Sequence, residues 1–91
     1  MLCDSCIKEL ALDTSREAPK VLKALLEAGQ LNKAGIKKKA GLSYAVNQRV
    51  VVELEAKMFI GFNFKGQSNE KIYHITDTGQ RLLKLYKEEL S

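Results

Sequence analysis

Residues 41–73 read GLSYAVNQRVVVELEAKMFIGFNFKGQSNEKIY, and this stretch contains a tight turn, a helix and a hairpin in that order. Gly41-Leu42 forms the turn, and Ser43 is a favourable N-cap for the helix that follows. We expect this helix to run to about Lys57. Its apolar residues recur at helical spacing and predict one wide buried face, made of Val46, Val50, Val51, Leu54 and Met58. The valines at 50–52 favour a strand by propensity alone, but the spacing and the cap favour a helix.

The residues after this helix predict a β-hairpin. Residues 59–65 are rich in aromatic side chains and alternate, as in a strand. Residues 66–69 form a polar turn that contains glycine and asparagine. Residues 71–75 then form the second strand.

A further helix is expected in residues 16–29. Ser15 is a good N-cap, and Arg16 opens the helix. Pro19 lies in the first turns, where a missing N–H is tolerated, and Gly29 ends the helix. The buried stripe of this helix is predicted to consist of Val21, Leu22, Leu25 and Leu26.

Three further helices complete the expected set. Asn32 caps a short helix over residues 33–40. A short helix is also predicted within residues 2–12, where apolar residues form a stripe. The last helix starts at Thr76 or Asp77 as the cap. One side of it carries Leu82, Leu83, Tyr86 and Leu90.

The order of elements is helix, helix, helix, helix, hairpin, helix. Three helices followed by a β-hairpin are typical of a winged helix-turn-helix, an α+β fold that is mostly α. We therefore expect a winged helix-turn-helix domain at residues 16–76, after an N-terminal segment at 1–15 and before a C-terminal helix at 77–91. The two end segments are the expected places for a dimer contact, and packing of the last helix on the core is the alternative.

Several of these residues resemble the winged helix-turn-helix DNA-binding proteins of archaea and crenarchaeal viruses. The resemblance covers about residues 18–88. It lies in Gly41-Leu42-Ser43-Tyr44-Ala45, Arg49, Leu54 and Phe59-Ile60, and in Ile72-Tyr73-His74-Ile75-Thr76-Asp77-Thr78-Gly79 followed by Leu82-Leu83. Relatives in that family often carry glycine at the place of Met58. The resemblance implies DNA binding and dimerisation, and it implies no catalysis.

The composition is that of a globular chain with one domain: 91 residues, 45% of them hydrophobic and 29% charged. No apolar run approaches the ~18 residues of a membrane span, and the first residues lack the pattern of a signal peptide. We expect a cytoplasmic protein (in the host cytoplasm if it is viral) with no membrane partner.

Residues 31–71 hold eight Lys/Arg against three Asp/Glu, an excess of +5, whereas residues 1–30 hold four against five. Such an excess suits a polyanionic partner, and a solvated basic face without a partner is the alternative.

The outward side of the helix at 43–57 supplies candidates for base contacts in the major groove of double-stranded DNA. These candidates are Ser43, Tyr44, Gln48 and Arg49. Glutamine can pair with adenine and arginine with guanine through two hydrogen bonds each. Asn47 faces nearer the edge of the core. The alternative for the outward residues is an ordinary solvated helix surface.

A second group of candidates would contact the DNA backbone or the minor groove. It comprises Lys37, Lys38 and Lys39 before the turn, and Lys65, Gln67, Ser68, Asn69 and Lys71 around the hairpin tip at 65–71. Phosphate contacts of this kind position a protein on DNA without reading sequence. Three successive helical residues cannot share one face, so at least one of the three lysines at 37–39 should point elsewhere. A simple polar loop is the alternative at the hairpin tip.

Cys3 and Cys6 form a Cys-x-x-Cys pair with four competing interpretations. A redox motif would sit in a βαβ setting, which the pattern lacks. A zinc site needs four ligands, so only a dimer could assemble one from these cysteines. Disulfides between subunits are the third interpretation, because intracellular proteins of hyperthermophiles do form them. The fourth is two small, reduced residues on a short helix.

The sequence shows no nucleophile motif, no phosphate-binding glycine loop and no convincing metal cluster. It therefore predicts no enzyme, no cofactor, no metal site and no small-molecule substrate. A lone His74 on the second strand is more often structural than catalytic. We expect a sequence-specific DNA-binding regulator that acts as a homodimer. A winged-helix module that binds protein, and a metal- or redox-responsive switch built on Cys3 and Cys6, are the open alternatives.

Overall fold

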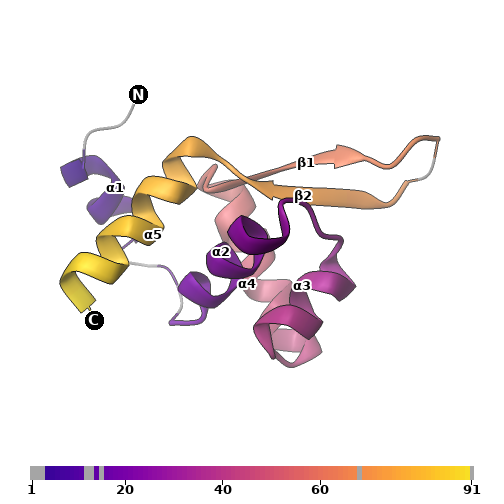
Figure 1. Ribbon diagram of the computed structural model, residues 1–91, viewed down its shortest axis with the longest axis horizontal. Coiled ribbons are helices and arrows are strands. Elements are labelled where there is room, and N and C mark those ends of the chain that lie inside the picture. Colours follow the sequence, from indigo (N-terminus) through magenta and orange to yellow (C-terminus); the bar gives the residue numbers. More distant parts are fainter. Residues whose placement is uncertain (1–3, 12–13, 15, 68, 91) are drawn as a thin grey trace.

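The computed structural model describes residues 4–11, 14, 16–67 and 69–90. Their order is α1 (Asp4–Ala11), α2 (Ala18–Ala28), α3 (Lys33–Ala40), α4 (Tyr44–Ala56), β1 (Ile60–Phe64), β2 (Lys71–Ile75) and α5 (Asp77–Leu90). The hairpin projects from one end of the molecule, and α1 and α5 lie at the opposite end (Figure 1). This arrangement confirms the predicted fold, a mostly helical winged helix-turn-helix with one antiparallel hairpin. We call β1, β2 and the turn between them the wing.

One core joins the described helices to the base of the wing. Its members are Ile7, Ala18, Val21, Leu22, Leu25, Ile36, Val50, Val51, Leu54, Phe59, Ile60, Tyr73, Leu82 and Leu83. Removing this apolar surface from water is the main favourable term in folding. The predicted faces of α2 and α4 are largely confirmed, but Leu26 is exposed. It lies about 100° around the helix from Leu25, which is beyond the edge of the buried stripe.

Helix α4 ends in a Schellman motif that holds methionine where glycine is usual. The amide of Phe59 donates to the carbonyl of Leu54 at 3.0 Å, and the amide of Met58 donates to that of Glu55 at 3.1 Å. Met58 adopts a φ of 64°, in the left-handed region. The prediction that Met58 ends the buried face is wrong, because the chain leaves the helix at Lys57 and the Met58 side chain is 73% exposed.

Side-chain caps begin three of the helices. The predicted caps Asn32 and Ser43 are confirmed, and Thr76 rather than Asp77 caps α5. Each side-chain oxygen accepts a hydrogen bond from the backbone amide three residues later, at 2.8, 3.3 and 3.0 Å respectively. Each cap satisfies an amide that the helix itself leaves without a partner.

Helix α2 begins later than predicted. Ala18 is its first residue, and Glu17 occupies the N-cap position without a side-chain hydrogen bond to the helix. Pro19 lies in the first turn as expected. The expected cap, Ser15, lies outside the described residues.

The wing pairs with a segment that the sequence did not identify. In the hairpin, Phe62 is opposite Tyr73 and Ile60 is opposite Ile75. On the other edge of β2, the amide of Tyr73 donates to the carbonyl of Leu31 at 2.7 Å, and the amide of Leu31 donates to that of Tyr73 at 3.1 Å. This single bridge attaches the connection between α2 and α3 to the wing.

Helices α1 and α5 pack against each other at the end opposite the wing (Figure 1). Ile7 of α1 is fully buried in the core. The hydroxyl groups of Thr14 and Tyr86 form a hydrogen bond of 3.0 Å beside these helices. No described helix combines the length and the apolar composition that crossing a bilayer requires.

Candidate nucleic-acid interface

The N-terminal half of α4 presents polar and aromatic side chains to solvent. Tyr44 is 74% exposed, Arg49 is exposed and Gln48 is half-buried. Ser43 is also exposed, and its hydroxyl serves as the N-cap. Tyr44 and Gln48 line the same hollow between α3 and α4, whereas Arg49 lies further around the helix and faces the start of α2.

A buried asparagine holds α4 against α3. The side-chain amide of Asn47 donates to the carbonyl of Lys33 at 3.1 Å, and the residue is only 4% exposed. Its side-chain oxygen is buried, and none of the residues in the described part of the chain forms a hydrogen bond with it. The buried position of Asn47 agrees with the expectation that it faces the core more than the other polar residues of this helix do.

Arg49 faces a carboxylate from another helix. Its guanidinium lies 3.9 Å from the carboxylate of Glu17 at the start of α2, and both side chains are partly exposed. Ion pairs at such exposed positions contribute little to stability. Arg49 thus lies on the outer side of α4, where Glu17 is its neighbour.

One of the three consecutive lysines lies beside the exposed end of α4. Lys37, Lys38 and Lys39 are all exposed on α3. A hollow of about 480 Å³ between α3 and α4 is lined by Lys33, Ala34, Lys37, Tyr44, Asn47 and Gln48. Lys37 thus joins the base-contact candidates, whereas Lys38 and Lys39 do not line this hollow.

Lys33 is the basic residue that sequence reasoning missed. It stands one helical turn before Lys37 on the same side of α3, and this spacing was the available signal. Lys33 also lines a second hollow, beneath the wing.

The wing tip is polar, but Lys71 turns away from it. Lys65, Gln67 and Asn69 are exposed, and Ser68 lies outside the described residues. The ammonium group of Lys71 lies 3.5 Å from the carboxylate of Glu55 on α4 and 4.2 Å from the centre of the Phe62 ring. Lys71 therefore connects the wing to α4, and this contact competes with any contact to DNA.

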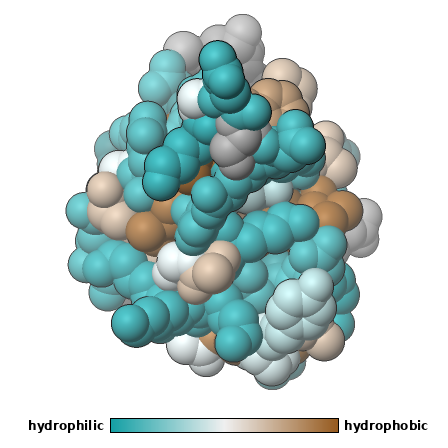
Figure 2. Space-filling view, turned by 90° about the vertical axis from the view of Figure 1, so that its right-hand side faces the viewer, coloured by the Kyte–Doolittle hydropathy of each residue, from teal (hydrophilic) through white to brown (hydrophobic). Residues whose placement is uncertain are grey.

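The face of the molecule toward the wing tip is mostly hydrophilic (Figure 2). Two acidic residues in the C-terminal half of α4 pair with lysines: Glu55 with Lys71, and Glu53 with Lys57 at 3.8 Å. The N-terminal half of α4 contains no acidic residue. The exposed positive charge on this side is thus not offset by carboxylates of the same half-helix.

The remaining candidates of the sequence analysis do not gather into a site. His74 packs over β1, since a Cβ at Gly61 would lie 2.9 Å from its Nε2 atom. Cys6 is half-buried in α1, and Cys3 lies outside the described residues. Within the part of the chain that the structure describes, no group of three or more His, Cys, Asp or Glu residues could hold a metal ion.

A family model described as winged helix-turn-helix matches residues 16–90. Curated proteins provide no significant match. The winged helix-turn-helix part of the resemblance is confirmed by this match, and the archaeal or viral affiliation stays a prediction.

Three solved structures illustrate what the fold is similar to. The PcaV transcriptional regulator from Streptomyces coelicolor, in complex with its natural ligand, is 20% identical with a TM-score of 0.78, over 87% of this chain and 57% of PcaV. BpsR from Bordetella bronchiseptica, whose DNA binding is regulated by 6-hydroxynicotinic acid, is 17% identical with a TM-score of 0.74, over 96% of this chain and 61% of BpsR. A mutant of MepR from S. aureus, bound to an oligodeoxyribonucleotide, is 20% identical with a TM-score of 0.74, over 92% of this chain and 64% of MepR. This chain spans about three fifths of the length of these proteins.

Proposed function

Because the chain belongs to the winged helix-turn-helix family, we propose that it binds double-stranded DNA as a sequence-specific transcriptional regulator. Helix α4 is the recognition helix and enters the major groove. The wing contacts the backbone or the adjacent minor groove. The winged helix-turn-helix part, residues 16–76, carries these contacts.

The observation that carries the proposal is the composition of the exposed N-terminal half of α4. Tyr44 and Gln48 offer hydrogen-bonding groups beside Lys37, and Arg49 is exposed further around the same helix. Base edges in the major groove are read by such groups, and lysines near them neutralise phosphates. A recognition helix needs one buried face and one exposed polar face, and α4 has both.

Homodimerisation is the second part of the proposal. The expected contact lies in the N-terminal segment at 1–15 and the C-terminal helix at 77–91, and the position of α1 and α5 at the end opposite the wing would leave the wing free for DNA. Cys3 and Cys6 are the candidates for disulfides between subunits. Two recognition helices would then reach half-sites about one helical turn, ~34 Å, apart.

Selection from a random pool of duplex DNA at low salt tests the proposal. We expect an enriched pseudo-palindromic sequence whose affinity falls steeply as salt is raised, with a slope set by the number of neutralised phosphates. A chain that retains no duplex at low salt would contradict DNA binding and favour a protein partner. Electrophoresis without reducing agent tests the disulfides: only a monomeric band would contradict them.

A further inference from the structure

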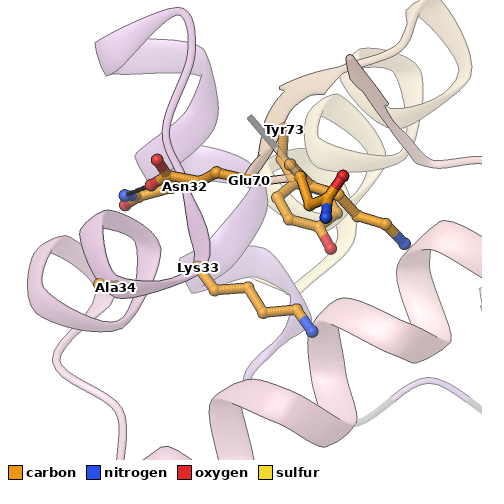
Figure 3. Close-up of a pocket in the computed structure, with 7 residues that line it drawn as sticks. Asn32, Lys33, Ala34, Glu70 and Tyr73 are labelled. Atoms are coloured by element: carbon orange, nitrogen blue, oxygen red, sulfur yellow. Dashed lines mark hydrogen bonds between the residues drawn. The ribbon is translucent and has the colours of Figure 1, made fainter. Parts of the chain in front are cut away.

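A second hollow lies between the start of α3 and the wing, along β2 and the turn that precedes it (Figure 3). Its volume is about 400 Å³, and we call it the wing hollow. It is lined by Asn32, Lys33, Ala34, Asn69, Glu70, Lys71 and Tyr73. Lys33 also lines the hollow between α3 and α4, so the two hollows adjoin at this residue.

The most unusual group in the wing hollow is the hydroxyl of Tyr73. The residue is fully buried, yet its hydroxyl oxygen has no hydrogen-bond partner among the residues that the structure describes. A buried polar group without a partner is costly, and native structures retain few of them without a reason. In Figure 3 the hydroxyl points toward the side of the hollow where the Lys33 side chain extends. Burial raises the pKa of this phenol, and the Glu55 carboxylate raises it further, so the hydroxyl keeps its proton and can donate it.

Lys33 is the lysine of the wing hollow that remains for a ligand. Glu70 also lines the hollow and keeps its negative charge, and its carboxylate accepts a hydrogen bond from the side-chain amide of Asn32 (Figure 3). The ammonium group of Lys71 is paired with Glu55 at 3.5 Å. Among the described residues, no ion pair involves Lys33, so its positive charge is available to a ligand. The side-chain amide of the exposed Asn69 adds a further donor.

We propose that the wing hollow binds a phosphate group, which accepts hydrogen bonds from the Tyr73 hydroxyl, the Lys33 ammonium and the Asn69 amide. A phosphate presents several acceptor oxygens and so suits a hollow with several donors. The phosphate belongs either to the DNA backbone or to a small phosphorylated compound, and the chemistry is the same in both cases. If the phosphate belongs to the DNA backbone, the inference rests on the proposed function. Lys33 lines both the wing hollow and the hollow beside α4, so a DNA strand that contacts α4 would pass close to it.

Titration of the isotope-labelled protein with inorganic phosphate at constant ionic strength, followed by the amide signals of Ala34 and Lys71, tests the site itself. We expect Tyr73→Phe and Lys33→Ala each to weaken phosphate binding about tenfold or more, as the loss of a hydrogen bond to a charged group predicts. Lys23→Ala is the matched control, because it removes an exposed lysine of α2 that does not line the hollow. Shifts that are absent, or that are equal in all four proteins, would overturn the proposal.

The melting temperature of Tyr73→Phe gives an independent readout. Since no described residue forms a hydrogen bond with the hydroxyl, its removal should leave the melting temperature unchanged or raise it slightly. A clear fall would show that the hydroxyl has a structural role, and it would overturn its assignment to a ligand.

Binding of duplex DNA by the same variants identifies the source of the phosphate. If the DNA backbone occupies the wing hollow, Tyr73→Phe weakens DNA binding, and Lys33→Ala lowers the salt slope by about one. If DNA binding is unchanged while phosphate binding is weakened, the ligand is a small phosphorylated compound. If the unmodified protein binds phosphate as expected but no DNA, the proposed function fails and the phosphate site stands.

Discussion

Gly79 of α5 lies against the backbone of Phe59, so closely that a Cβ at Gly79 would come within 2.0 Å of the Phe59 carbonyl oxygen. The two Phe59 atoms in this contact belong to the backbone and cannot move aside as a flexible side chain can, and the Ile75 side chain lies 2.8 Å away as well. Gly79→Ala should therefore destabilise the fold by about 3 kcal/mol, which corresponds to a fall in melting temperature of about 12–24 °C for a domain of this size. Thermal unfolding measures this fall in melting temperature. Gln80→Ala changes the next residue, which is exposed, and this control should melt like the unmodified protein. Similar melting of both variants would contradict the close contact.

Met58 should be a position where glycine stabilises the protein. Its φ of 64° disfavours any residue with a Cβ, and its exposed side chain gains little from burial. We expect Met58→Gly to raise the free energy of unfolding by about 1 kcal/mol, measured by urea denaturation. Met58→Ala keeps the Cβ and should bring no such gain. Equal stability of the glycine and alanine variants would show that the left-handed backbone is not strained.

The stability of the protein should decline at alkaline pH through Tyr73. Burial and the Glu55 carboxylate raise the pKa of Tyr73 above the usual value of about 10. The unfolded chain therefore releases this proton at a lower pH than the folded protein does. The contribution of Tyr73 to the free energy of unfolding is fully present below about pH 10. It is lost as the pH rises toward the pKa that Tyr73 has in the folded protein. Urea denaturation across this pH range should show that the free energy of unfolding declines more steeply for the unmodified protein than for Tyr73→Phe. Parallel declines in the two proteins would contradict the raised pKa of Tyr73.

Arg49 and Lys38 should differ in what they contribute to DNA binding. Arg49→Ala should remove about 1–3 kcal/mol of discrimination between the selected sequence and its variants, because a two-hydrogen-bond contact to a base is lost. Lys38→Ala should weaken binding to all sequences alike and lower the salt slope by about one. Competition binding with matched and mismatched duplexes measures both effects. Equal loss of discrimination in the two variants would contradict the assignment of the outer face of α4.

Local features of the sequence predicted most of the fold. The caps Asn32 and Ser43 act within one helical turn, and the buried face of α4 follows from its periodic spacing. Such signals need only neighbouring residues to be read. The error at Met58 has the same origin: the helical period continues in the sequence, but the backbone has already left the helix.

Contacts between residues that are far apart in the sequence could not be predicted from local features. The alternation of the second strand places Lys71 near the wing tip, but nothing local reveals that Glu55 and Phe62 meet its ammonium group. In the same way, Glu17 reaches Arg49 only after α2 and α4 have packed. The candidate base contacts could be proposed from local spacing because they lie on one helix, whereas the wing hollow combines residues from two elements.

The paired hydrogen bonds between Leu31 and Tyr73 have a consequence for hydrogen exchange. Both amide hydrogens are held by the same bridge, so one local opening exposes the two of them together. Tyr73 is fully buried, whereas Leu31 belongs to a connection between helices that would otherwise exchange quickly. The amide of Leu31 should therefore be protected to the same degree as that of Tyr73, and the connection between α2 and α3 should open only when the base of the wing does.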